Sequence, residues 1–202
     1  MMDWWKLIPA LLAGYLLGSI SVAVLLTKRL SKGDIRKQGS GNAGATNVAR
    51  VYGIGVGLAT LVGDGVKTAL AMYLGSLLAG EAGMILAAFG CLMGHCFPLY
   101  FGFKGGKAVS VSAAIGLFLD WRFFLILLAV FILTFLCTKR VSVCSMAAAV
   151  AYPLGMLALG CFPWYTLVLG CFITVFVIFM HRENLKRLLK GTEPKFTLGS
   201  RK

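Results

Sequence analysis

The stretch WWKLIPALLAGYLLGSISVAVLLT, residues 4–27, decides which kind of fold this chain can adopt. Lys6, near its start, is its only charge, and the stretch exceeds the ~20 residues that a helix needs to cross the hydrocarbon core of a bilayer. A basic cluster follows it, made of Lys28, Arg29, Lys32, Arg36 and Lys37. A cleaved signal peptide carries its cations ahead of a shorter apolar core, so the sequence predicts an uncleaved transmembrane helix with its amino terminus outside.

The composition of the whole chain of 202 residues also indicates a membrane protein. Hydrophobic residues make up 59% and charged residues 13%, and the mean hydropathy is +0.86. A soluble domain is about half apolar and about a quarter charged, so a soluble α/β enzyme is excluded. The formal net charge of +13 would suit a disordered tail that binds nucleic acid, but such a tail is not this apolar, and we expect no nucleic-acid partner.

Further apolar stretches predict an all-α integral membrane protein with about seven transmembrane helices. After the first, they run at about 51–80, 84–101, 108–119, 123–137, 141–162 and 164–180. An odd number of spans places the carboxyl terminus in the cytoplasm. The 51–80 stretch is too long for one upright helix and contains several glycines, so it is tilted, kinked or broken into two helices.

The distribution of cations supports this topology independently. Segments 28–50, 104–107, 139–140 and 181–202, all on the predicted inner side, carry 17 Lys and Arg residues. Only Lys6 and Arg122 fall on the outer side, and Lys67 lies within a span. The sequence predicts a single polytopic membrane domain over residues 1–202, whose inner loops 28–50, 102–107 and 138–142 and tail 181–202 form an active site.

The first polar segment is GSGNAGATNVAR, residues 39–50. Its glycines let the backbone approach a ligand, and its Ser, Asn and Thr side chains add short hydrogen bonds, which suits a phosphate or an oxyanion. Residues 39–44 match the dinucleotide fingerprint G-x-G-x-x-G, but that motif has meaning only after a strand, and here a membrane span and a basic loop precede it. A flexible polar loop would explain the glycines, but not two Asn, a Thr and Arg50 together.

The second polar segment runs from Gly94-His95 to Gly105-Gly106-Lys107. We expect Gly105 and Gly106 to leave bare amides at the start of the next helix, where the helix dipole and the neighbouring Lys104 and Lys107 favour an anion. The segment is not a Walker A loop, because it has Phe at 101 and Ala at 108 where that motif needs Gly and Ser or Thr. The two lysines are also explained as plain positive-inside anchors.

The third polar segment is the tail from His181 to Lys195. His181 and Asn184 are three residues apart and share one helix face. The leucines and cations that follow are equally typical of an interfacial anchoring helix.

Asp64 and Lys67, in the second span, are also three residues apart and can form an ion pair, which lowers the cost of burying either charge. Such a pair is functional or purely structural. The six cysteines stand in or beside apolar stretches without C-x-x-C spacing, so we interpret them as packing residues and expect no metal.

Together the three segments resemble the signature of the bacterial acyl-phosphate:glycerol-3-phosphate acyltransferases, the PlsY-type family, over nearly the whole chain. Asp64-x-x-Lys67 and Arg140-x-Ser142-x-x-Ser145 also fit that family. Val109-Ser110 stands where Ala-Thr is usual, and Leu185 replaces a common Ile; neither departure touches a polar role.

The resemblance implies transfer of a fatty acyl group from acyl phosphate to the 1-hydroxyl of glycerol 3-phosphate, giving lysophosphatidic acid and phosphate, at the cytoplasmic face of a bacterial inner membrane. The donor is a mixed anhydride and already activated, so no cofactor, metal, acyl-enzyme or obligatory protein partner is expected, and positioning and charge stabilisation supply most of the rate.

The residues that the resemblance assigns fall into three groups. The expected catalytic residues are Ser40, Asn42, Arg50, Lys107, Ser145, His181 and Asn184. The expected phosphate-binding residues are Gly41, Gly44, Thr46, Asn47, Lys67, Lys104, Gly105 and Gly106. The expected structural supports are Asp64, Ser142 and Glu193.

The proton acceptor is either His181 or a substrate phosphate. If it is the phosphate, His181 orients that phosphate. From the sequence we favour this orienting role for His181. Neither His95 nor His181 has an Asp five residues on, so the H-x-x-x-x-D dyad of other glycerolipid acyltransferases is absent. The alternative function is a transporter of a small organic anion, but the sequence shows no inverted repeat and its polar clusters gather at one face.

Overall fold

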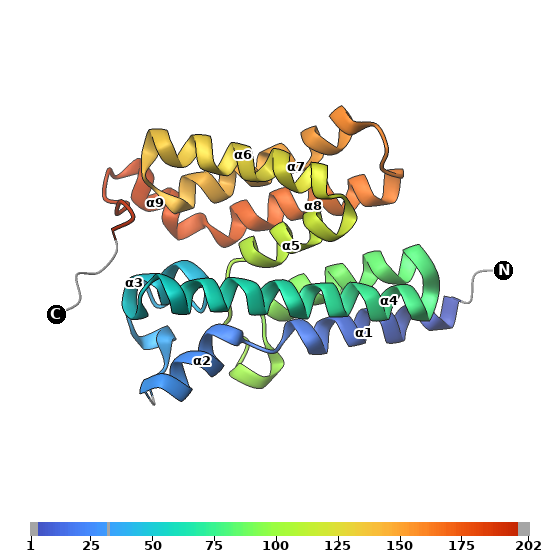
Figure 1. Cartoon of the computed structure of the whole chain (residues 1–202), viewed down its shortest axis with the longest axis horizontal. Helices are drawn as coiled ribbons and strands as arrows, with labels where there is room; N and C mark the ends of the chain where they lie inside the picture. The colour runs from blue at the N-terminus through green and yellow to red at the C-terminus, as the bar shows by residue number, and fades with distance from the viewer. Residues whose placement is uncertain (1–3, 32, 198–202) are drawn as a thin grey trace. The chain divides into compact units, whose positions relative to one another are not determined.

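The computed structural model describes residues 4–31 and 33–197; Lys32 of the basic cluster lies outside the described residues. Within the described part of the chain every regular element is a helix, which confirms the all-α prediction (Figure 1). The described residues divide into two compact units. The first contains the residues up to Ile115 together with Thr197, and the second contains Gly116–Phe196. That residues 1–202 act as one polytopic domain stays a prediction.

The first unit contains a series of helices, with 3₁₀ turns between some of them. They are η1 (Trp4–Lys6), α1 (Leu7–Gly18), α2 (Val22–Ser31), η2 (Ile35–Lys37), α3 (Ala45–Tyr52), α4 (Ile54–Cys96) and η3 (Leu99–Phe101). Helix α5 (Val109–Leu119) begins in the first unit and ends in the second, which then contains α6 (Trp121–Thr138), α7 (Val141–Leu159), α8 (Trp164–Met180) and α9 (Arg182–Leu189).

Helix α1 packs along α4, as Figure 1 shows, and the contact is made by glycines on both helices. Gly14 and Gly18 of α1 meet the second half of α4, where Gly90 and Gly94 repeat the same four-residue spacing. A Cβ on Gly14 would lie 2.7 Å from the Cα of Ala87, well inside van der Waals contact. Small residues at this spacing let two membrane helices approach closely enough for backbone packing. This contact was not predicted from the sequence.

The first predicted span is not one helix, which corrects the expectation of an unbroken 4–27 segment. Helix α1 ends at Gly18 and α2 begins at Val22. The break frees the backbone carbonyls of Gly18 and Ile20, and the Lys67 ammonium donates to both, at 3.1 and 2.8 Å. In apolar surroundings a broken helix needs such a donor, so the ammonium of Lys67 makes this break tolerable.

The region predicted as 51–80 and 84–101 contains two breaks. Gly53, with φ 91°, separates α3 from α4. Ala79 and Gly80 have non-helical backbone angles and divide α4 into two helical segments. A Cβ on Gly83 would lie 3.2 Å from the carbonyl carbon of Gly75, so the two segments pack closely beside this bend. Residues 51–80 therefore contain the end of the short helix α3 and then one long helical segment, from Ile54 to the bend.

Among the described residues, four segments are long and apolar enough to cross a membrane: Trp4–Leu30, Ile54–Phe101, Trp121–Thr138 and Val141–Leu159. A fifth is obtained if α8 and α9, which are bent by 58° at their junction, form one span. The chain is thus a multi-pass membrane protein by length and composition. The count of seven and the sides of the two termini stay predictions.

The second unit has an aromatic core between α6, α7 and α8. The rings of Phe123 and Tyr152 meet edge to face with centroids 4.9 Å apart. Gly155 and Gly170 allow the close approach of α7 to its neighbours, since a Cβ on Gly155 would lie 3.0 Å from the Phe123 ring. Large apolar side chains such as Leu133 and Val175 stay exposed on the same helices, as expected for surfaces that face lipid.

Candidate active site

The first polar segment folds into a compact loop around the buried side chain of Asn47. Its amide oxygen accepts from the backbone N–H of Ser40 at 2.8 Å, and its amide nitrogen lies within reach of the carbonyls of Ile35, Gln38 and Asn42, at 3.3, 3.0 and 3.0 Å. These contacts use the hydrogen-bonding capacity of the Asn47 amide. Asn47 therefore organises the loop.

The side chains that this loop presents are those of Ser40, Asn42, Thr46 and Arg50. Ser40 is exposed and the other three are half-buried. Within residues 4–31 and 33–197, Arg50 has no hydrogen-bonded or ionic partner. A half-buried guanidinium without a protein anion nearby is suited to bind an anionic ligand.

The predicted ion pair in α4 is confirmed, and it belongs to a larger buried network. Lys67 Nζ lies 2.9 Å from Asp64 Oδ1 and 3.1 Å from His95 Nδ1. The other carboxylate oxygen, Asp64 Oδ2, accepts from Ser110 Oγ at 2.7 Å. The three charged or imidazole side chains are each at most 5% exposed. The hydroxyl of Ser110, where the family usually has Thr, thus has a buried partner.

The loop between α4 and α5 corrects the expectation of bare glycine amides. The N–H of Gly105 donates to the carbonyl of Cys96 at 3.1 Å, and the N–H of Gly106 donates to the carbonyl of His95 at 3.0 Å. Helix α4 leaves these last carbonyls without intrahelical partners, and the loop amides satisfy them. The glycines are needed for close packing: a Cβ on Gly105 would lie 2.8 Å from Pro98 Cδ and closer still to the carbonyl oxygen of His95.

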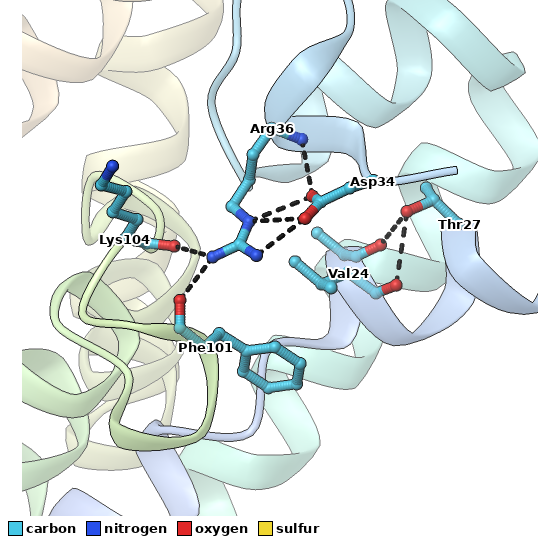
Figure 2. A network of polar contacts seen from close by, with 7 residues as sticks. Val24, Thr27, Asp34, Arg36, Phe101 and Lys104 are labelled. Carbon is cyan, nitrogen blue, oxygen red and sulfur yellow. Dashed lines mark hydrogen bonds and ion pairs between the residues drawn. The ribbon is translucent and has the colours of Figure 1, made fainter. Parts of the chain in front are cut away.

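Arg36 ties the first loop to the α4–α5 loop, as Figure 2 shows. Its guanidinium forms a forked ion pair with Asp34, with the shortest contact at 2.7 Å. The same group donates to the carbonyls of Phe101 and Lys104. The hydrogen bonds from Arg36 lower the pKa of Asp34 to about 2. Arg36 is thus more than a positive-inside anchor, which is all that the sequence indicated.

In the second unit the tail is fixed by the buried carboxylate of Glu193. Glu193 Oε1 accepts from Ser142 Oγ and from Asn184 Nδ2, both at 2.6 Å, and Oε2 accepts from Arg187 Nε at 2.7 Å. Burial alone raises the pKa of Glu193, but these three hydrogen bonds outweigh it and hold the pKa below its ordinary value. The backbone carbonyl of Glu193 also accepts from Arg140 Nε at 3.0 Å.

His181 lies at the junction of α8 and α9 and is 4% exposed. Its Nδ1 lies 2.8 Å from the carbonyl of Val177, which can only accept. In a neutral ring Nδ1 therefore carries the hydrogen and Nε2 is the acceptor. The hydroxyl of Ser145, another predicted catalytic residue, donates to Val141 O of its own helix at 2.8 Å.

The predicted residues fall into two sets, one in each unit. The first unit holds Ser40, Gly41, Asn42, Gly44, Thr46, Asn47, Arg50, Asp64, Lys67, Lys104, Gly105, Gly106 and Lys107, and the second holds Ser142, Ser145, His181, Asn184 and Glu193. The first set is cationic and rich in short polar side chains, and the second contains an imidazole acceptor beside an ordered tail. Among the described residues no three His, Cys, Asp or Glu side chains form a group that could hold a metal ion.

Comparisons with known proteins identify the family of the chain and agree with its fold. A family model described as glycerol-3-phosphate acyltransferase matches residues 8–191. The glycerol-3-phosphate acyltransferase of Syntrophomonas wolfei is 42% identical over 183 residues, covering 91% of this chain and 93% of the relative. That of Brucella anthropi is 41% identical over 191 residues, covering 94% of this chain and 92% of the relative.

Crystal structures of PlsY (YgiH), an integral membrane glycerol 3-phosphate acyltransferase, are similar over 95% of this chain and 96% of theirs, at 30% identity. The TM-score is 0.88 for the glycerol 3-phosphate form and 0.86 for the lysophosphatidic acid form. These matches confirm the resemblance that the three polar segments indicated.

Proposed function

The chain belongs to the glycerol-3-phosphate acyltransferase family, and we propose that it transfers a fatty acyl group from acyl phosphate to the 1-hydroxyl of glycerol 3-phosphate, giving lysophosphatidic acid and phosphate. The observation that carries the proposal is the likeness, over nearly the whole of both chains, to a structure with glycerol 3-phosphate. The cationic loops of the first unit add chemical support, because both substrates carry phosphate.

The reaction needs no covalent enzyme intermediate. The hydroxyl oxygen of glycerol 3-phosphate attacks the acyl carbonyl carbon, the bond from that carbon to the phosphate oxygen breaks, and phosphate leaves with the electron pair. The hydroxyl proton passes to a base. We assign that base to His181, because its Nδ1 donates to a carbonyl and its Nε2 is then an acceptor, suited to a hydroxyl proton more than to a phosphate oxygen. This assignment replaces the orienting role favoured from the sequence.

The other side chains divide the remaining work. Ser40, Asn42, Thr46, Arg50, Lys104 and Lys107 bind and orient the two phosphate groups and stabilise the charge that develops on the leaving phosphate. Asn47, Gly105 and Gly106 act through the shape of their loops, because their amide groups already have backbone partners. Asp64, Lys67, Ser142 and Glu193 hold the framework, and Asn184 fixes the tail next to His181.

The same proposal includes the topology. Helix α4 crosses twice around its bend at Ala79-Gly80, and with the segments at α1–α2, α5, α6, α7 and α8 this gives seven crossings, with the amino terminus outside and the carboxyl terminus cytoplasmic. The strong excess of Lys and Arg on the inner segments supports this orientation in a bacterial inner membrane.

The test is turnover by the detergent-purified full chain supplied with an acyl phosphate and glycerol 3-phosphate. We expect equal amounts of lysophosphatidic acid and phosphate, with no product when glycerol 3-phosphate is left out. Arg50→Ala and Lys107→Ala should each lower kcat/KM by about 10- to 100-fold, because a charge-assisted contact is worth about 1.5–3 kcal/mol.

Arg29→Ala is the matched control for net charge, because Arg29 is exposed and has no partner among the described residues. Normal turnover in Arg50→Ala and Lys107→Ala would refute the assignment of these cations. Absence of any turnover in the folded wild-type chain would refute the activity itself.

A further inference from the structure

The imidazole of His95 stands between the buried ion pair of α4 and the glycine loop that follows this helix. Lys67 Nζ has four potential acceptors at 2.8–3.1 Å, namely Ile20 O, Asp64 Oδ1, Gly18 O and His95 Nδ1. The ammonium group can only donate, and its three hydrogens are shared among these four acceptors, so a neutral His95 ring with its hydrogen on Nε2 can accept at Nδ1. Asp64 Oδ1 lies 3.6 Å from the same ring nitrogen. His95 is only 6% exposed, and its contact with Lys67 fixes the orientation of the ring.

The opposite edge of the ring lies directly against Gly106. A Cβ built on Gly106 would lie 2.8 Å from His95 Cε1 and 3.0 Å from Cδ2, and closer still to Nε2. Gly106 itself is buried, and its N–H donates to the backbone carbonyl of the same histidine. His95 therefore supports this loop twice, through its backbone and through the ring edge.

Both lysines of the α4–α5 loop are close to Gly106 in sequence. Lys107 is its immediate neighbour and Lys104 comes two residues before it, with the Gly105 amide bound to Cys96 O between them. A shift of Gly106 would therefore displace both lysines relative to helix α4. His95 belongs to the second polar segment, and no role was predicted for it from the sequence.

We propose that His95 is a positioning residue for glycerol 3-phosphate. Its ring, which Lys67 and Asp64 orient, fixes the distance between Gly106 and the end of α4. The ring thereby places Lys104 and Lys107 for the substrate phosphate. The inference rests on the proposed function, since it names a support for the same binding loop. It also explains the buried Lys67–Asp64 pair as an element that orients a ring.

Two substitutions separate the two edges of the ring. In His95→Asn the side-chain oxygen can replace Nδ1 as acceptor for Lys67, but nothing reaches Gly106. In His95→Gln the longer side chain extends toward Gly106. We expect His95→Asn to raise the KM for glycerol 3-phosphate several-fold with the KM for acyl phosphate unchanged, and His95→Gln to recover part of that change.

The decisive measurement is a double-mutant cycle with the two glycines. Gly106→Ala should raise the KM for glycerol 3-phosphate, and adding His95→Asn should lower it again by about threefold or more, because the ring that collides with the new methyl group has gone. Gly105→Ala is the matched control. Its methyl group would meet the backbone oxygens of His95 and Cys96, so His95→Asn should not rescue it.

Coupling in the Gly106 cycle with none in the Gly105 cycle supports the proposal. Additive effects in both cycles, or rescue of both glycine variants alike, would overturn it. Thermal unfolding of each variant in detergent checks that the protein is folded. If His95→Asn does not fold, the cycle of Gly106→Ala with His95→Gln replaces it. Partial rescue of the KM of Gly106→Ala then supports the proposal, and additive effects or full rescue overturn it. If the wild-type chain turns over no substrate, the proposed function fails instead.

Discussion

Replacing Glu193 should destabilise the second unit by an amount that the structure allows to be worked out. In Glu193→Gln the side-chain oxygen can keep the hydrogen bonds from Ser142 and Asn184, both 2.6 Å long. The amide nitrogen then faces Arg187 Nε, a donor, in place of the 2.7 Å charge-assisted hydrogen bond. Loss of that one bond costs about 1.5–3 kcal/mol, and we expect the lower part of the range because the Arg187 side chain is 42% exposed and can turn to water.

Glu193→Ala removes all three contacts and leaves the buried Ser142 and Asn184 groups without their acceptor. Breaking a buried charged network in this way costs about 3–5 kcal/mol. The matched control is Glu183→Gln: Glu183 pairs with Lys186 at 3.0 Å, but its side chain is 58% exposed. An exposed pair of this kind contributes little to stability, so its loss should not measurably change the unfolding temperature.

The assay is thermal unfolding of the purified variants in the same detergent, compared at one heating rate because unfolding of membrane proteins is often irreversible. One kcal/mol corresponds to roughly 2–4 °C in a domain of this size, so the order expected is Glu183→Gln unchanged, Glu193→Gln lowered and Glu193→Ala lowered further. The pKa of Glu193 is held below its ordinary value, so its contribution is complete above about pH 4.3 and is lost as the pH falls through the lowered pKa. Equal unfolding temperatures for the two Gln variants would refute the reasoning.

Three further changes test other parts of the site. Arg36→Ala should raise the KM for glycerol 3-phosphate several-fold, because the carbonyls of Phe101 and Lys104 lose their donor, with the exposed Lys37→Ala as a control that leaves the KM unchanged. Ser110→Thr should keep wild-type thermal stability, whereas Ser110→Ala should lose about 1.5–3 kcal/mol with the hydrogen bond to Asp64. His181→Gln should lose the rise of kcat/KM with pH that a histidine base produces, and a rise that persists in the variant would assign proton removal to a substrate phosphate.

The helices were predictable because membrane spans follow from hydropathy alone. The breaks within them were less so. Gly18 to Ser21 is part of one apolar stretch in the sequence, and the donor for the two freed carbonyls comes from the distant Lys67. The glycine packing of α1 on α4 has a recognisable spacing at Gly14 and Gly18, which a search for small residues four apart would have found.

The side chains of the site were predictable as residue types, but several of their partners were not. The Asp64–Lys67 pair follows from helical spacing, whereas His95 joins it from the far end of α4, 28 residues from Lys67 in sequence. The role of Arg36 could not be predicted, because it belongs to a basic cluster that the positive-inside rule already explains. Its pairing with Asp34 depends on the conformation of the turn between α2 and η2, which hydropathy does not determine.

The α4–α5 loop shows why a glycine-rich motif has two physical meanings. Glycine allows a backbone N–H to face a ligand, and it also leaves room where a Cβ would collide with a neighbour. At Gly105 and Gly106 the structure selects the second meaning, because both amides are bound to the last carbonyls of α4 and the missing methyl groups face Pro98 and the ring of His95. In the proposed site the lysines of this loop, Lys104 and Lys107, supply the positive charge that attracts a phosphate, and the glycines set the geometry of the loop.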